Sequence, residues 1–267
     1  MKPSHLVLFF LFVILAISAN AQKLPNVQTT SLRAPADIKV DGKATEWKKF
    51  QAYNKATDVY YSLANDKDKL YLVIQATDEY IIKKMLWGQT IVTINATGKK
   101  DDIKSIAIGY PVMKRNDRPF INFKEKHEII KGNARSITEA DSFMNINNKR
   151  LEEKSKLIKV AGLKDIDSLI SVYNADGIKA ASAFNNKMVY TYELAVDLKL
   201  LGLDVNTPAR FYYNIKLDQL SAQDIPGVKI SYDNKGNITS FDISNIQSYS
   251  PSYSLATDFW GEYTLTK

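Results

Sequence analysis

The sequence contains no cysteine, and this absence removes several kinds of chemistry. Without thiols the chain can have no disulfide, no thiolate-ligated zinc, no covalently attached haem and no cysteine nucleophile. A cysteine at the cleavage point of an export signal would have marked a lipoprotein, so lipid anchoring by that route is excluded too. A domain of this size can do without disulfides because it can bury a large core.

Histidine is almost as scarce, with two residues in 267. Only His127 lies beyond the apolar N-terminal segment, and it sits in a charged, irregular stretch. No G-x-S-x-G sequence marks a hydrolase nucleophile, and no second histidine follows His127 at the spacing of a zinc-binding helix. We therefore interpret His127 as a surface residue and expect no Ser-His-Asp site.

Paired carboxylates are the remaining route to catalysis, because two acids can hydrolyse a glycoside without a histidine. The available acids are Asp58, Asp66, Asp68, Asp78, Glu79 and Glu193. Most of them lie in predicted turns, where aspartate is common in any protein. We expect a protein that is not an enzyme, with a glycoside hydrolase as the less favoured alternative. Gly98-Lys99 lacks the remaining residues of a phosphate-binding loop and is interpreted as a turn.

Long hydrophobic runs are absent except near the N-terminus. Residues 6–17 form an apolar run after Lys2, and small residues then give an A-x-A cleavage site before Gln22. The pattern predicts that residues 1–21 are a signal peptide. The alternative is an uncleaved membrane anchor, although a membrane span needs roughly 20 residues. Export without cysteine indicates the periplasm or the exterior of a bacterial cell, and no later segment is apolar enough to span a membrane.

Charge of one sign is not concentrated at any point of the chain. The net charge is +7, but the lysines are scattered beside acidic residues. No stretch interleaves arginine with aromatic residues as nucleic-acid-binding surfaces do. We interpret the lysines as solvated faces and expect no nucleic-acid partner, while a weak attraction to acidic glycans stays open.

What the sequence does have is many short apolar segments separated by turn residues, with 15 tyrosines and 11 phenylalanines. Residues 188–196 show the clearest alternation, which predicts one buried face. The predicted strands are residues 38–40, 58–64, 69–76, 90–95, 103–108, 156–160, 169–173, 178–184, 188–196, 211–217, 228–232, 238–243 and 260–265. So many short strands with one helix predict an all-β fold, an antiparallel sandwich or barrel, and we favour a sandwich of the jelly-roll or immunoglobulin type.

Helices are predicted at few places. Residues 79–86 fit one or two helical turns. Ser136 and Glu139 form a capping box ahead of apolar residues at helical spacing, which predicts a helix over residues 137–154. Residues 22–34 are polar and rich in turn residues, and we expect an extended leader there. A single β-sandwich domain would then occupy residues 35–267.

Several short motifs resemble family 9 carbohydrate-binding modules and their bacterial relatives. They are residues 38–42 with Glu46-Trp47, residues 70–72 with 76–78, Trp87 ahead of the strand at 90–95, residues 192–196 with 198 and 201–203, and residues 259–262. The resemblance covers most of residues 35–267. It implies a β-sandwich that holds polysaccharide or oligosaccharide between aromatic rings and binds calcium in its loops. Against this pattern, residues 109–154 look like an insertion with one helix.

Trp87 is the candidate sugar-binding ring. It follows a short helical turn and is more open to a surface role than Trp47 or Trp260, which are both expected in the core. The C–H groups of a sugar can stack on such a ring while its hydroxyls stay hydrated. Three tyrosines would complete the platform, unless they only cover the core: Tyr80, Tyr249 and Tyr253.

Asp66, Asp68 and Asp78 are candidate calcium ligands, because this hard cation prefers carboxylate and carbonyl oxygens. Residues 233–237 partly resemble a calcium loop but lack the acid that closes an EF-hand. Hairpin turns are the alternative for both segments. The sequence thus predicts a non-catalytic, exported binding module for carbohydrate. The alternative is a structural or protein-interaction sandwich in which residues 109–154 contact a protein partner.

Overall fold

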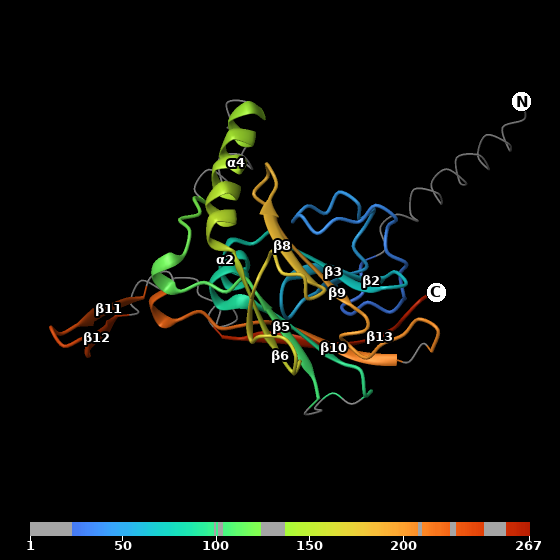
Figure 1. Ribbon diagram of the computed structural model, residues 1–267. Coiled ribbons are helices and arrows are strands. Elements are labelled where there is room, and N and C mark those ends of the chain that lie inside the picture. The colour runs from blue at the N-terminus through green and yellow to red at the C-terminus, as the bar shows by residue number, and fades with distance from the viewer. Residues whose placement is uncertain are drawn as a thin grey trace, which may run out of the picture.

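The computed structural model describes residues 23–98, 100, 104–123, 137–207, 210–224, 228–242 and 255–267. Within these ranges the chain forms a β-sandwich of two antiparallel sheets, with a separate two-stranded hairpin and few helices (Figure 1). The predicted signal peptide, residues 1–21, lies outside the described residues. None of the helices in the described ranges has the length and apolar character needed to cross a bilayer.

The first sheet has five strands in the order β1-β2-β3-β9-β8. In chain order they are β1 (Ala52–Asn54), β2 (Val59–Asn65), β3 (Lys69–Ala76), β8 (Ile178–Phe184) and β9 (Tyr190–Asp197). The predicted hairpin of residues 58–64 and 69–76 is confirmed, with Leu63 opposite Leu72. Asp66 closes its turn by accepting the backbone N–H groups of Asp68 and Lys69, both at 2.7 Å.

The second sheet has six strands in the order β13-β10-β4-β5-β6-β7. In chain order they are β4 (Thr90–Asn95), β5 (Ile106–Tyr110), β6 (Leu157–Ala161), β7 (Leu169–Ser171), β10 (Arg210–Leu217) and β13 (Thr257–Thr264). Every neighbouring pair is antiparallel. The strands therefore alternate in direction, as the predicted sandwich requires.

The two sheets close over one hydrophobic core. Tyr61 of β2 and Tyr213 of β10 meet between them, with their hydroxyl oxygens 2.9 Å apart. The ring centroid of Tyr61 also lies 5.0 Å from that of Phe259 on β13. These contacts join the layers by aromatic packing and one buried hydrogen bond. Trp260, next to Phe259, faces the other side of β13 and is only half-buried, so its predicted place in the core is wrong.

The outer face of the five-stranded sheet is covered as well. A second apolar cluster lies there, made of Ala34, Trp47, Ala64, Tyr71, Val73 and Ala195. Ile38 and Val40 pack against it without forming a strand, so the strand predicted at residues 38–40 is wrong. Their alternation reflects a loop that presses apolar side chains onto the sheet. Trp47 is buried, as predicted.

The described part of the predicted leader packs against β2. The Gln28 side chain bonds the backbone of Leu63 in both directions, each at 2.8 Å. Its backbone N–H donates to the Tyr61 hydroxyl, also at 2.8 Å. Arg33 forms an isolated parallel bridge with Asn65. Residues 23–34 are therefore part of the sandwich, and its packing begins before residue 35.

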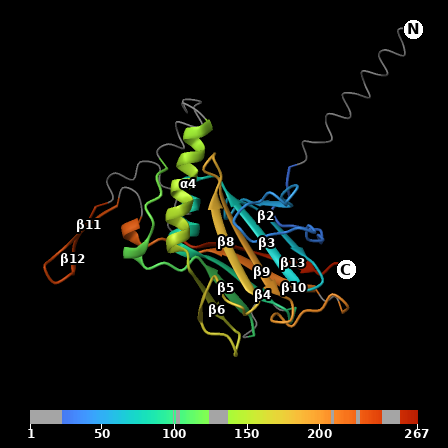
Figure 2. The ribbon, with the colours of Figure 1, turned by 45° about the horizontal axis from the view of Figure 1, so that its top comes forward.

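The predicted helix is confirmed as α4 (Ile137–Lys154), although Ser136 of the capping box lies outside the described residues. It belongs to the connection from β5 to β6, two strands that pair directly with each other. Asn148 of α4 exchanges two hydrogen bonds with the backbone of Phe184, at 2.7 and 2.8 Å. Helix α4 thereby covers the end of the edge strand β8 (Figures 1 and 2).

The hairpin of β11 (Lys229–Tyr232) and β12 (Ile238–Asp242) points away from the sandwich (Figures 1 and 2). Its turn is organised by Asp233, which accepts the backbone N–H groups of Lys235 and Asn237, both at 2.8 Å. Residues 233–237 are therefore a hairpin turn, one of the two interpretations that the sequence left open.

Candidate functional site

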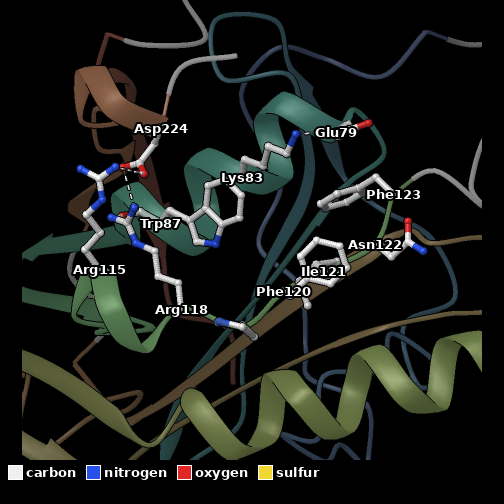
Figure 3. A pocket seen from close by; sticks show the side chains of 11 residues that line it. Glu79, Lys83, Trp87, Arg115, Arg118, Phe120, Ile121, Asn122, Phe123 and Asp224 are labelled. Atoms are coloured by element: carbon white, nitrogen blue, oxygen red, sulfur yellow. Dashed lines mark hydrogen bonds and ion pairs between the residues drawn. The ribbon is translucent and has the colours of Figure 1, made fainter. Parts of the chain in front are cut away.

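A cleft of about 670 Å³ lies between four short helical elements (Figure 3). They are α2 (Glu79–Lys83), the π-helical turn η1 (Lys84–Gln89), and the 3-10 turns η2 (Arg115–Asp117) and η3 (Ala222–Asp224). The lining side chains belong to Glu79, Lys83, Trp87, Arg115, Arg118, Pro119, Phe120, Ile121, Asn122, Phe123 and Asp224. Helices α2 and η1 form one wall, and residues 115–123 form the wall that faces it.

The first wall is an amphipathic helical stretch. Asp78 caps it by accepting the N–H groups of Tyr80 and Ile81 at 2.8 and 3.1 Å. Residues 79, 83 and 87 are four apart, so they share one face and point into the cleft. The other face is buried in the core and carries Ile81, Ile82, Met85 and Leu86. The helical turns predicted for residues 79–86 are confirmed and extend three residues further.

Helix η1 is held tightly against the second sheet. At Gly88 a Cβ atom would lie 2.3 Å from the carbonyl oxygen of Asp218, so this close approach requires glycine. Lys84 is buried, and its ammonium group donates to the Leu255 carbonyl at 2.7 Å and to Thr257 Oγ1 at 2.9 Å. Burial lowers the pKa of Lys84 to about 8. Trp87 therefore extends from a fixed backbone.

The facing wall is tied to the first by arginine. Arg118 donates to the Trp87 carbonyl at 2.9 Å and forms an ion pair with Asp224 at 2.5 Å. Arg115 lies 3.8 Å from the other oxygen of Asp224. Burial opposes the ionisation of Asp224, but hydrogen bonds from Ser221 and Arg118 and the charges of both arginines outweigh it and lower the pKa of Asp224.

Trp87 is the aromatic centre of the cleft. Its ring is half-buried, and the Lys83 ammonium and the Arg118 guanidinium each lie 5.9 Å from its centroid. The Lys83 ammonium also lies 5.4 Å from the ring centroid of Phe123, and Phe120 stands at the rim with 72% of its surface exposed. The Trp87 indole N–H has no acceptor among the residues that the structure describes. The cleft thus combines ring surfaces with charged donors and acceptors.

The other predicted binding tyrosines are placed differently. Tyr80 does not line the cleft, but its ring lies 5.5 Å from the Lys83 ammonium, next to it. Tyr249 and Tyr253 lie outside the described residues, as does His127. Of the predicted platform, the structure places Trp87 in the cleft and Tyr80 beside it.

The predicted calcium ligands do not come together. Asp66 and Asp78 lie at opposite ends of β3, which spans about 26 Å at the usual rise per residue. Each carboxylate has another partner. Asp78 caps α2, and Asp66 accepts the Tyr71 hydroxyl at 2.8 Å. Asp68 pairs with exposed Lys67. Across the described ranges, no three histidine, aspartate or glutamate side chains are grouped so that they could hold a metal.

Glu193, a candidate acid of the hydrolase alternative, is shielded from solvent. It is on the outer face of β9 and 1% exposed. Its Oε2 accepts the N–H groups of Asp41 and Gly42, and its Oε1 accepts the Trp47 indole N–H, all at 3.0 Å. In the structure this carboxylate binds the N-terminal cover, residues 32–50, to the outer face of the five-stranded sheet.

Arg115, Arg118 and Asp224 are cleft residues that the sequence did not predict. The available signal was the charged stretch at residues 115–119, with two arginines just before an aromatic residue. No family model matches the chain, and comparison with curated proteins finds no significant match. The resemblance to family 9 carbohydrate-binding modules therefore stays a prediction.

Proposed function

We propose that this protein is a non-catalytic module that binds carbohydrate in the cleft between α2–η1 and residues 115–123. The observation that carries the proposal is the position of Trp87, a half-buried ring that lines an open cleft among paired charges. A sugar presents apolar C–H faces and a rim of hydroxyl groups. It therefore matches a site in which a ring lies beside hydrogen-bonding groups.

The polar groups of the cleft fit this role because they are held in place before a ligand arrives. Arg118 is fixed by Trp87 and Asp224, and Lys83 is fixed by Glu79 at 2.5 Å. Ion-paired side chains of this kind offer both donors and acceptors to hydroxyl groups without much loss of side-chain entropy. The volume of about 670 Å³ is within the usual range of small-ligand sites, about 300–1,000 Å³.

The sequence supports the rest of the proposal. The family 9 resemblance favours a jelly-roll type of sandwich, and the predicted signal peptide favours the periplasm or the cell exterior. A module in that location would meet polysaccharides.

Substitution of Trp87 tests the proposal. We expect Trp87→Ala to weaken binding to a polysaccharide by about 2 kcal/mol, roughly 30-fold, in affinity electrophoresis or calorimetry. Phe120→Ala, at the exposed rim, should weaken binding less and leave the core intact. Trp260→Ala is the matched control, because this half-buried tryptophan lines a different cavity. If no polysaccharide in a broad panel binds, or if Trp87→Ala binds as the wild type does, the proposal is wrong.

A protein partner is the second candidate function. Large apolar side chains are exposed on α4 and on the β11–β12 hairpin: Ile137, Ile146, Ile238 and Phe241. Exposed apolar groups on projecting elements are typical of interaction surfaces. Ile137→Ser should weaken association with such a partner and leave sugar binding unchanged, which separates the two functions.

A further inference from the structure

We infer that the ligand is an acidic glycan and that Arg115 binds its carboxylate or sulfate group. The inference rests on the proposed carbohydrate-binding function and names the class of sugar. Its starting point is the charge of the cleft, where three cationic side chains face two carboxylates.

Two of the three cations are already neutralised by close partners. Asp224 pairs with Arg118 at 2.5 Å, and Glu79 pairs with Lys83 at 2.5 Å. Arg115 is the remaining charge. Its distance to Asp224 is 3.8 Å, which is its one ion pair within the described residues, and its side chain is 45% exposed. The cleft thus has one excess positive charge, on the side chain that solvent reaches best.

Arginine suits an anionic substituent of a sugar better than a hydroxyl group. Its planar guanidinium can donate two parallel hydrogen bonds to a carboxylate or a sulfate, and such charge-assisted bonds are roughly twice as strong as neutral ones. Asp224 lies 3.8 Å from Arg115, beyond hydrogen-bond range, so it attracts this guanidinium by charge alone. The positive net charge of the whole chain would assist the encounter with a polyanion.

Arg115 also stands between two cavities. Beside the Trp87 cleft lies a second one of about 520 Å³, lined by Arg115, Asn116, Val228, Ile230 and Tyr232. Tyr232, on the projecting hairpin, is partly exposed and supplies a further ring. A single sugar would occupy one cavity. A glycan chain would fill both and pass Arg115 between them, so the geometry favours an acidic polymer over a monosaccharide.

Matched pairs of polymers test this inference. The first pair is polygalacturonate and its fully methyl-esterified form, which share a backbone and differ in charge. The second pair is dextran sulfate and dextran. We expect the acidic member of at least one pair to bind tenfold or more tightly than its neutral partner. Arg115→Gln should remove about tenfold of that affinity and weaken binding of the neutral polymers far less.

Arg210→Gln is the matched control. This arginine is 64% exposed, forms one ion pair with Glu262, and lies at the other end of β10 from the cleft. It should bind all four polymers as the wild type does. An equal loss in Arg115→Gln and Arg210→Gln would assign binding to the overall charge of the protein and overturn the inference.

The outcomes separate this inference from the proposed function. If neutral and acidic polymers bind equally and Trp87→Ala weakens both, the carbohydrate function holds and the role of Arg115 is wrong. If no polymer binds, or Trp87→Ala has no effect, the proposed function itself fails. Preference for polygalacturonate supports a carboxylate ligand, and preference for dextran sulfate supports a sulfate ester.

Discussion

Replacing Glu193 with glutamine tests how the N-terminal cover is held on the sandwich. Three donors face this buried carboxylate, from Asp41, Gly42 and Trp47. Burial raises the pKa of Glu193 from its ordinary value of 4.5 to about 7, and the three hydrogen bonds offset only part of that increase. The native protein therefore takes up a proton at Glu193 near neutral pH.

The sign and size of the effect follow from proton linkage. Because the native pKa lies above the unfolded one, protonation of Glu193 stabilises the native state. That contribution is fully present below about pH 4.5, decreases as the pH rises, and is lost above about pH 7. At about 1.4 kcal/mol for each pH unit, the interval from 4.5 to about 7 corresponds to about 3 kcal/mol.

Glutamine does not titrate, so the two proteins should diverge with pH. Urea denaturation followed by tryptophan fluorescence, at several values between pH 4.5 and 8, measures the free energy of unfolding of both. Relative to Glu193→Gln, the wild type should lose about 3 kcal/mol as the pH rises. Glu153→Gln, on the exposed side of α4, should differ from the wild type by less than about 0.5 kcal/mol throughout. A constant difference for Glu193→Gln would refute the reasoning.

Three further predictions concern stability. Tyr61→Phe should lower the free energy of unfolding by about 1–3 kcal/mol, because it leaves the Tyr213 hydroxyl and the Gln28 N–H without their buried partner; a change below 0.5 kcal/mol in urea denaturation would contradict this. Asp78→Ala should lower the free energy of unfolding by about 1 kcal/mol through loss of the helix cap, and an unchanged Tm would contradict this role. Calcium or EDTA should leave the Tm of the wild type unchanged, because Asp66, Asp68 and Asp78 do not come together, and a calcium-dependent rise in Tm would contradict this expectation.

Much of the fold could be predicted because its signals are local. Strands β3, β4 and β8 and helix α4 have the predicted bounds. Each is a short apolar or periodic segment, and turn residues or a capping sequence mark most of their ends. The short strand β1 was missed, because three residues carry too little pattern to be recognised.

The covering of the outer sheet face could not be predicted from local pattern. Residues 188–196 alternate as if only one face were buried, yet nearly all of β9 is buried on both faces. The cover comes from residues 32–50, which are distant in the sequence. Alternation reports the residues of one strand and carries no information about what packs on it.

The candidate site was predictable at its tryptophan, because tryptophan is a rare residue type. It was missed at its charged residues, because such residues are common. Trp87 stands out because the chain has three tryptophans. Arg115 and Asp224 look like ordinary surface charges, and more than a hundred residues separate them along the chain. Only the folded chain brings them within 3.8 Å of each other.

The direct pairing of β5 with β6 has a consequence for how this protein can change. The connection between them, residues 111–156, starts and finishes at adjacent positions of one sheet, so its length can vary while the pairing of β5 with β6 stays in place. One wall of the cleft is built entirely from this connection. Proteins with the same two sheets could therefore bind quite different ligands if only this connection differed between them.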